Sequence, residues 1–256
     1  MTAFANHSGG RSFLHSLLFS CGTFFFRFRN ALFPVMFVVL LLVTRPGLFL
    51  GSANLDRIAI ILGALVALAG QGFRLLVIGY VYIKRGGKRR AIYANKLVVE
   101  GIYNHTRNPM YVGNFLITVG VGMMYGSPWI YLFVIPFFSF VYLSIVVAEE
   151  TFLRNKFGEE YEEYAKRVNR FVPDFRGIEK SLKDYQYDWR RAIRKDYGTI
   201  FGTLFGIILI CLWKTYYFHG YQARRGELLI LASFLIPLFS SYALIRYLKV
   251  RGDLDS

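Results

Sequence analysis

Ionisable side chains stand in or beside apolar stretches at three places along this sequence. Arg74, with Gln71 one turn earlier, lies inside one apolar stretch, and the pair Glu149-Glu150 ends another. The third place is the segment 107–114, which opens a third apolar stretch with an arginine and an asparagine. Because charged groups at membrane depth are costly, each place is a candidate functional site.

The glutamate pair needs a cation nearby. A carboxylate is disfavoured at a helix C-terminus, where the macrodipole is negative, so we expect a protein side chain or a ligand amine to compensate Glu149 and Glu150. Arg74 has two interpretations. Its long side chain can snorkel to the lipid headgroups, or it can bind the anionic group of an acceptor that enters between the second and third membrane spans.

The segment 107–114 combines a helix start with residues that a helix start does not require. Pro109 suits the first helical position and Asn108 suits the cap before it. Capping does not explain why Arg107 and Tyr111 lie one turn apart at the N-terminus of this helix, nor why Asn114 lies inside the apolar helix. A ligand pocket explains both features.

A helix with one apolar face is expected after the glutamates. Its apolar positions recur at spacings of four, three and four: Phe157, Tyr161, Tyr164 and Val168. Arg167 and Arg170 lie one turn apart on its polar side. A solvated charged helix would explain the glutamate-rich turn between 159 and 163 but not the tyrosine stripe.

The elements that must position these residues are membrane helices. The chain has 256 residues, of which 55% are apolar, and a mean hydropathy of +0.38, which is too hydrophobic for an ordinary soluble domain. About 20 helical residues cross a bilayer, and six stretches approach that length: 31–50, 58–83, 109–125, 128–148, 199–217 and 228–248. The sequence therefore predicts an all-α, polytopic membrane helical bundle with about six transmembrane helices and a cofactor pocket on the cytoplasmic side.

The charge distribution predicts the orientation. The net charge is +15, and most basic residues fall in the N-terminus, the 84–107 loop, the 149–197 segment and the C-terminus. The positive-inside rule then places both termini in the cytoplasm. Attraction to anionic lipid headgroups explains this basicity better than nucleic-acid binding. Cys21 and Cys211 are too far apart in sequence to suggest a disulfide framework or a metal site.

The motifs around these candidate residues resemble the integral-membrane methyltransferases that include isoprenylcysteine carboxyl methyltransferase and the phospholipid N-methyltransferases. The shared pattern is LVxxGxYxxxR(H/N)PxYxG, a helical hairpin, and then EExxLxxxFGxxYxxYxxRVxRFxP. The first motif here comprises Leu97-Val98, Gly101, Tyr103, Arg107-Asn108-Pro109, Tyr111 and Gly113. The second comprises Glu149-Glu150, Leu153, Phe157-Gly158, Tyr161, Tyr164, Arg167-Val168, Arg170 and Pro173. The resemblance covers residues 70–175.

The resemblance implies S-adenosylmethionine as methyl donor, held at the cytoplasmic membrane boundary. Its methionine end is a zwitterion that suits a carboxylate and a guanidinium. The candidates for that end are Glu149 or Glu150 together with Arg167 or Arg170. Candidates for an adenine slot are Tyr111, Tyr161 and Tyr164, and the other first-motif residues expected at the donor site are Arg107, Asn108 and Gly113.

The implied acceptor is a membrane lipid or a lipidated protein, methylated at a phospholipid amine or an isoprenylcysteine carboxylate. The prenylcysteine branch usually has His where this chain has Asn108, which favours the amine. An amine must lose a proton before attack, and the candidate bases are Glu149, Glu150 and His105, whereas a carboxylate needs no base. We expect Arg74 beside the phosphate or carboxylate of the acceptor.

Two other classes remain open. An NADPH-dependent membrane lipid or sterol double-bond reductase resembles this core and carries RHPxYxGD, where Asn108 and Asn114 replace its His and Asp. A transporter or scaffold would show repeated halves or a polar path across several spans, and the sequence shows neither. Retention of S-adenosylmethionine without NADPH would separate these classes.

Three segments are expected. Residues 1–69 hold an N-terminal interfacial segment, which includes the uncleaved apolar stretch 13–26, and the first spans. The stretch 31–50 contains Pro34 and is interrupted at 44–47, so a bend in it, or its pairing with 13–26 as a re-entrant or interfacial element, is the alternative to a straight span. Residues 70–175 form the methyltransferase core. Residues 176–256 hold two further spans, preceded by an amphipathic interfacial helix over 174–197.

Overall fold

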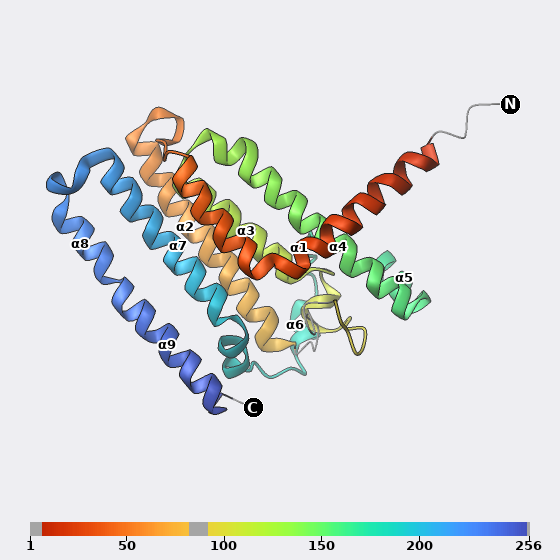
Figure 1. Cartoon of the computed structure of the whole chain (residues 1–256). Coiled ribbons are helices and arrows are strands. Elements are labelled where there is room, and N and C mark those ends of the chain that lie inside the picture. Colours follow the sequence, from red (N-terminus) through yellow and green to blue (C-terminus); the bar gives the residue numbers. More distant parts are fainter. Residues whose placement is uncertain (1–6, 82–91, 255–256) are drawn as a thin grey trace.

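The computed structural model describes residues 7–81 and 92–254, and within them every regular element is helical. The expected all-α membrane bundle is confirmed (Figure 1). The main helices are α1 (His7–Val43), α2 (Ala53–Tyr80), α3 (Pro109–Tyr125), α4 (Ile135–Phe157), α5 (Glu159–Arg167), α6 (Ile178–Leu182), α7 (Trp189–Ala223), α8 (Arg225–Ser233) and α9 (Leu235–Arg251). Short 3-10 turns η1 (Phe49–Gly51) and η2 (Gly101–Asn104) and the π-helical turn η3 (Ile130–Val134) join them.

Among the described residues, four helices are long and apolar enough to cross a membrane, or five if the bent α1 counts as one span. They are Ala53–Tyr80, Ile130–Phe157, Trp189–Ala223 and Arg225–Arg251. Helix α3 matches the predicted stretch 109–125 but has only 17 residues, the lower limit for a crossing. The helices have the length and composition of an integral membrane protein; the count of six and the side of the termini stay predictions.

Helix α1 differs from the expected first span. It begins upstream of residue 31 and ends at Val43, because the following segment carries Pro46, and a proline disfavours helical backbone in the residue before it. Its parts Phe13–Arg29 and Pro34–Leu40 are inclined at 92° to each other. A proline inside a helix removes a backbone hydrogen bond, and Pro34 lies at the start of the second part. The first part leaves the bundle beside α4 (Figure 1).

Helices α2 and α3 pack backbone to backbone through glycines. A Cβ on Gly120 would lie 2.4 Å from the Gly63 carbonyl oxygen, and one on Gly70 would lie 2.7 Å from that of Gly113. Small residues allow this approach between membrane helices. The acceptor route that we expect between the second and third spans is therefore wrong along this contact.

The C-terminal third also differs from its prediction. The amphipathic helix expected over 174–197 is wrong as one element: α6 ends at Leu182, a non-helical segment follows, and α7 begins after Asp188. The Asp188 side chain accepts a hydrogen bond from the Arg191 backbone N–H at 2.9 Å. Asp188 thus caps the N-terminus of α7, in the middle of the single helix expected over 174–197. Helix α7 then runs along α2, with α8 and α9 outside it (Figure 1).

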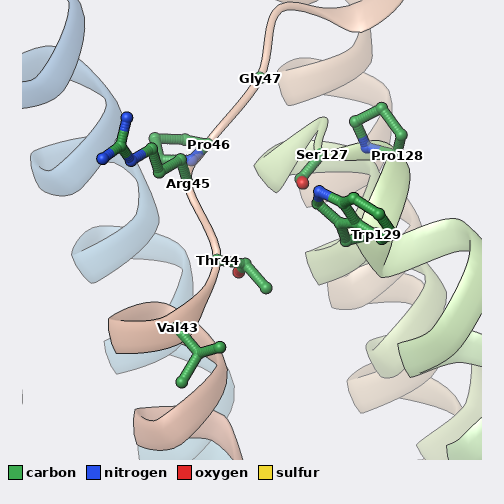
Figure 2. Close-up of a pocket in the computed structure, with 8 residues that line it drawn as sticks. All are labelled: Val43, Thr44, Arg45, Pro46, Gly47, Ser127, Pro128 and Trp129. Carbon is green, nitrogen blue, oxygen red and sulfur yellow. The ribbon is translucent and has the colours of Figure 1, made fainter.

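The two ends of the bundle differ in composition. At the end where α3 turns into α4, the Lys214 ammonium donates to Asp56 Oδ1 at 2.7 Å and to the Met124 carbonyl oxygen at 3.0 Å. A hollow of about 360 Å³ lies there between the segments 43–47 and 127–129 (Figure 2). The motif residues gather at the opposite end, where η2, α5 and α6 lie (Figure 1).

Candidate functional site

Glu150 is the centre of the site, and both sequence motifs contribute to its surroundings. The residue is 2% exposed. Glu150 Oε1 accepts from Asn108 Nδ2 at 3.1 Å, and Oε2 accepts from Arg170 Nε and Nη2 at 3.0 and 2.8 Å. Arg107 Nη1 lies 3.6 Å from Oε1. The protein thus supplies two cations to Glu150.

Backbone contacts hold the two motifs against each other. The Arg107 N–H donates to the Asn169 carbonyl oxygen at 2.9 Å, and Thr106 Oγ1 donates to the Phe171 carbonyl oxygen at 3.2 Å. Asn108 Nδ2 also donates to the Arg170 carbonyl oxygen at 3.2 Å. The loop before α3 and the loop after α5 therefore form one wall around Glu150.

Asn108 does not perform the role that its position suggests. It precedes Pro109 at the start of α3, as predicted, but its side chain makes no capping hydrogen bond. The amide is turned to Glu150 instead. Asn108 is 4% exposed, so its amide is committed to the buried cluster rather than to the helix end.

The charges of this cluster do not cancel. One carboxylate, Glu150, faces two guanidinium groups, Arg107 and Arg170, which leaves one positive charge in excess. Arg107 Nε is buried and has no hydrogen-bond partner among the described residues. An unsatisfied buried donor beside a surplus positive charge suits an anionic ligand group, such as a carboxylate.

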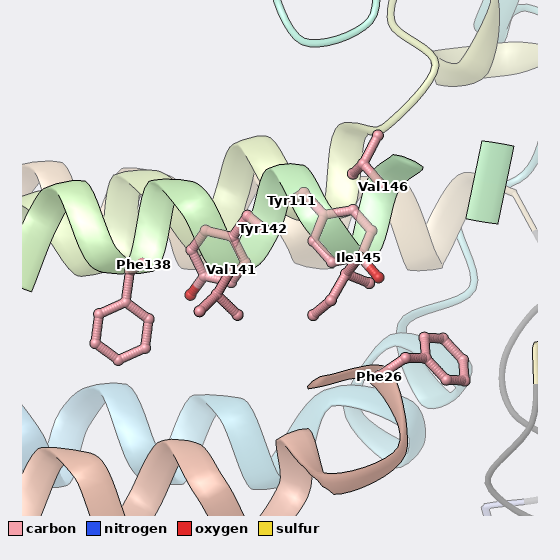
Figure 3. Close-up of a cluster of buried hydrophobic side chains, with 7 residues drawn as sticks. All are labelled: Phe26, Tyr111, Phe138, Val141, Tyr142, Ile145 and Val146. Carbon is pink, nitrogen blue, oxygen red and sulfur yellow. The ribbon is translucent and has the colours of Figure 1, made fainter. Parts of the chain in front are cut away.

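Glu149 turns in another direction. Tyr111 Oη donates to Glu149 Oε1 at 2.8 Å. The Tyr111 ring belongs to a buried apolar cluster between α1, α3 and α4, whose members are Phe26, Tyr111, Phe138, Val141, Tyr142, Ile145 and Val146 (Figure 3). The two neighbouring glutamates therefore lie in separate environments, one beside a surplus of positive charge and one beside an apolar cluster.

Tyr161 and Tyr164 lie in a packed core. They are 1% and 4% exposed, and their ring centroids are 6.2 Å apart. Tyr164 Oη donates to the Tyr103 carbonyl oxygen at 2.7 Å. The rings join α5 to the segment before α3, together with Leu97 and Leu153. The structure thus gives this tyrosine stripe a packing role, and an adenine slot beside it stays a prediction.

His105 and Arg167 lie beside the cluster rather than in it. The His105 ring contacts the Asp174 carbonyl oxygen and lies 2.9 Å from Ser181 Oγ, so it tethers α6 and the segment before it. Arg167 is exposed and lines a surface hollow of about 140 Å³ with His105 and Asp174. Hydrogen bonds from Arg176 hold the pKa of Asp174 below its usual range. Of the two predicted arginine partners, Arg170 meets Glu150.

Arg74 is buried and lies against the chain's own carboxylate. Its Nε donates to Asp196 Oδ2 at 3.1 Å, its Nη2 contacts Asp196 Oδ1, and its Nη1 donates to Asn114 Oδ1. Gln71 Nε2 donates to Asp196 Oδ2 at 2.7 Å. Gly113 makes room for this arrangement, since a Cβ there would lie 2.5 Å from Arg74 Cγ. Snorkelling of Arg74 to the headgroups is therefore wrong.

Sequence reasoning missed two residues. Asp196 is a lone carboxylate among the basic residues that open α7, and that isolation was the available signal. Arg29 lies in α1 and donates to Tyr111 Oη at 3.2 Å. No local motif marks Arg29, because only the packing of α1 on α4 brings it to the site.

Comparison with known proteins relates part of the chain to membrane methyltransferases. Residues 58–160 match the family model for phospholipid methyltransferase. A protein-S-isoprenylcysteine O-methyltransferase of Schizosaccharomyces pombe is 37% identical over 81 residues, which are 30% of this chain and 33% of that protein. Protein-S-isoprenylcysteine O-methyltransferase B of Arabidopsis thaliana is 32% identical over 127 residues, 47% of this chain and 59% of that protein.

Another relative carries a different name. The cobalt-zinc-cadmium resistance protein CzcN of Cupriavidus metallidurans is 35% identical over 79 residues, 31% of this chain and 36% of that protein. The chain thus spans only a third to about three fifths of these relatives' lengths. No solved structure matches it significantly. Within these limits the predicted resemblance is confirmed: residues 58–160 match the family model for phospholipid methyltransferase, and relatives named isoprenylcysteine methyltransferases are similar to part of the chain.

Proposed function

We propose that the chain is an integral-membrane methyltransferase that uses S-adenosylmethionine and acts on a lipid-like acceptor. The observation that carries this proposal is the Glu150 cluster, in which both family motifs meet around one carboxylate with an excess of guanidinium. The family match over residues 58–160 and the names of the relatives support the reaction class.

The cluster fits the methionine end of the donor. Glu150 is already hydrogen bonded to Asn108 and Arg170, so we assign it to the positioning of Arg107 and Arg170. The N–H groups of these arginines that Glu150 does not use are the candidates for the donor carboxylate. The first of them is Arg107 Nε, which has no partner in the part of the chain that the structure describes. When bound, the donor supplies an electrophilic methyl group, whose C–S electron pair returns to sulfur as the acceptor lone pair forms the new bond.

The acceptor determines whether the chain must also move a proton. An amine acceptor gives up a proton, for which we propose Glu149 because its Oε1 is hydrogen bonded to Tyr111 and it lies beside Glu150 on α4. A prenylcysteine carboxylate needs no base. Asn108 favours the amine, whereas the names of the relatives favour the prenylcysteine.

The test is ligand binding followed by acceptor choice. We expect the purified full chain in neutral detergent to bind S-adenosylmethionine in calorimetry and not NADPH. Phosphatidylethanolamine and farnesylcysteine are then offered separately with the donor, and the methylated product identifies the acceptor. Binding of NADPH without S-adenosylmethionine would support the reductase, and binding of neither would favour a transporter or scaffold.

A further inference from the structure

Arg29 of α1 reaches the candidate site from outside the region that matches the family. Its Nη1 donates to Tyr111 Oη at 3.2 Å, and that hydroxyl donates in turn to Glu149 Oε1 at 2.8 Å. The guanidinium carbon lies 4.3 Å from the centroid of the Phe26 ring. Arg29 and Glu149 are therefore the two ends of a short hydrogen-bonded chain, with a neutral phenol between them.

The charge of Arg29 is not cancelled by the described protein. Its partners are the Tyr111 hydroxyl and an aromatic ring, and it forms no ion pair with a carboxylate of the described residues. Arg74, by contrast, is neutralised by Asp196. A half-buried guanidinium whose contacts within the described part of the chain are a hydroxyl and a ring face keeps donor capacity for an anion.

The position of Arg29 suits a lipid. It is the last residue of the first part of α1, where the helix turns by 92° and leaves the bundle beside α4. This part exposes large apolar side chains, among them Phe13, Leu17, Phe24 and Phe28, as a segment at a membrane surface does. An amphiphile can place its apolar chain along these side chains with its headgroup at Arg29.

The two glutamates divide the site accordingly. Successive residues of a helix point about 100° apart, so Glu149 and Glu150 serve different partners. Glu150 faces Arg107 and Arg170, and Glu149 faces Tyr111. On the proposed function, the Glu150 side holds the donor and the Glu149 side is left for the acceptor.

We propose that Arg29 binds the anionic group of the lipid acceptor, a phosphate or a carboxylate, as a positioning residue that Tyr111 couples to Glu149. This inference rests on the proposed function. Helix α1, which lies outside the family match, then supplies the recognition of the acceptor headgroup.

Binding of simple amphiphiles tests the inference. The full chain in neutral detergent is titrated with dodecyl phosphate, laurate, uncharged dodecanol and inorganic phosphate. We expect both anionic amphiphiles to bind more tightly than dodecanol and inorganic phosphate. Arg29→Gln should weaken their binding by about tenfold or more, the usual range for a charge-assisted hydrogen bond, and leave dodecanol and S-adenosylmethionine binding unchanged.

Arg27→Gln is the matched control. Arg27 lies two residues earlier in α1, over the Phe28 ring at 5.6 Å, and is exposed. Equal losses in both variants would show general surface attraction and overturn the inference, as would undiminished binding in Arg29→Gln. Inorganic phosphate binding as tightly as dodecyl phosphate would point to a free anion and overturn the lipid assignment.

Two further measurements keep the outcomes separable. Arg29→Lys, which keeps the charge, should retain most of the binding, so its loss together with a lowered melting temperature would indicate a structural role instead. Failure of the wild-type chain to bind S-adenosylmethionine would defeat the proposed function. The amphiphile titrations of the wild-type chain and Arg29→Gln do not require the donor, so they would still show whether Arg29 binds an anionic headgroup. Normal donor binding with no effect of Arg29→Gln would defeat this inference alone.

Discussion

Two clusters of carboxylate and guanidinium, one around the buried Asp196 and one around the buried Glu150, differ in how completely their hydrogen bonds and charges are satisfied. At Asp196, one carboxylate meets one guanidinium, Arg74, and Gln71 and Asn114 take part in further hydrogen bonds. At Glu150, one carboxylate meets two guanidiniums, and one buried N–H of Arg107 has no partner among the described residues.

The difference separates a structural contact from a candidate binding site. A closed pair with satisfied neighbours fastens α7 to α2 and offers little to a ligand. An open cluster with a net positive charge favours the binding of an anion, because a buried donor without a hydrogen-bond partner costs free energy. The two central carboxylates are each 2% exposed, so the burial of the carboxylate alone would not have told the clusters apart.

The largest expected effect comes from opening the closed cluster. Asp196→Ala leaves Arg74 buried without its counter-charge, and removal of one partner of a buried pair costs about 3–5 kcal/mol. We expect a large fall in the thermal stability of the full chain in detergent. The double variant Arg74→Met with Asp196→Leu should recover much of it, and failure to do so would show that α7 is held by other contacts.

Neutralising Glu150 in the open cluster should affect ligand binding more than folding. Glu150→Gln keeps the shape but removes the charge that positions Arg107 and Arg170. We expect binding of S-adenosylmethionine to weaken about tenfold to hundredfold, with a smaller fall in melting temperature than in Asp196→Ala. Calorimetry and thermal unfolding measure the two effects. A stability loss equal to that of Asp196→Ala with intact donor binding would make both clusters structural.

Arg167 and Arg170, the two arginines of the second motif, test which of them belongs to the open cluster at Glu150. Arg170→Ala removes two hydrogen bonds to Glu150 and should weaken donor binding about tenfold. Arg167→Ala changes an exposed side chain and should alter donor binding by no more than about 0.5 kcal/mol, the usual range for surface substitutions. A larger loss of donor binding in Arg167→Ala than in Arg170→Ala would indicate that the donor carboxylate binds in the surface hollow beside His105.

The smallest effect is expected at a surface hydrogen bond. Tyr185 Oη donates to Glu100 Oε2 at 2.7 Å, which raises the pKa of Tyr185 to about 12 from its ordinary 10.0. Because the folded pKa is the higher one, the contribution to stability is present below pH 10 and is lost as the pH rises toward 12. In Tyr185→Phe, the tyrosinate absorbance should lose its component near pH 12 and neutral stability should change little. A wild-type titration complete near pH 10 would contradict the bond.

Local sequence patterns determined the elements closest to the site. Residues 109–125 form α3 as predicted, with Pro109 in its first turn. The short link of Tyr125, Gly126, Ser127 and Pro128 forms a tight hairpin, in which Gly126 takes a φ of 72° that side chains disfavour. Helix caps, proline positions and apolar spacing are local properties, so the sequence carries them without help from the fold.

The partners of the charged side chains were decided by the tertiary structure. The sequence restricted the donor site to one of two glutamates and one of two arginines, and packing of the loops around α3 and α5 paired Glu150 with Arg170. The contacts of Arg74 with Asp196 and of Arg29 with Tyr111 join residues 122 and 82 positions apart. Such pairs depend on which helix faces meet, and no local spacing along one helix encodes the face of another.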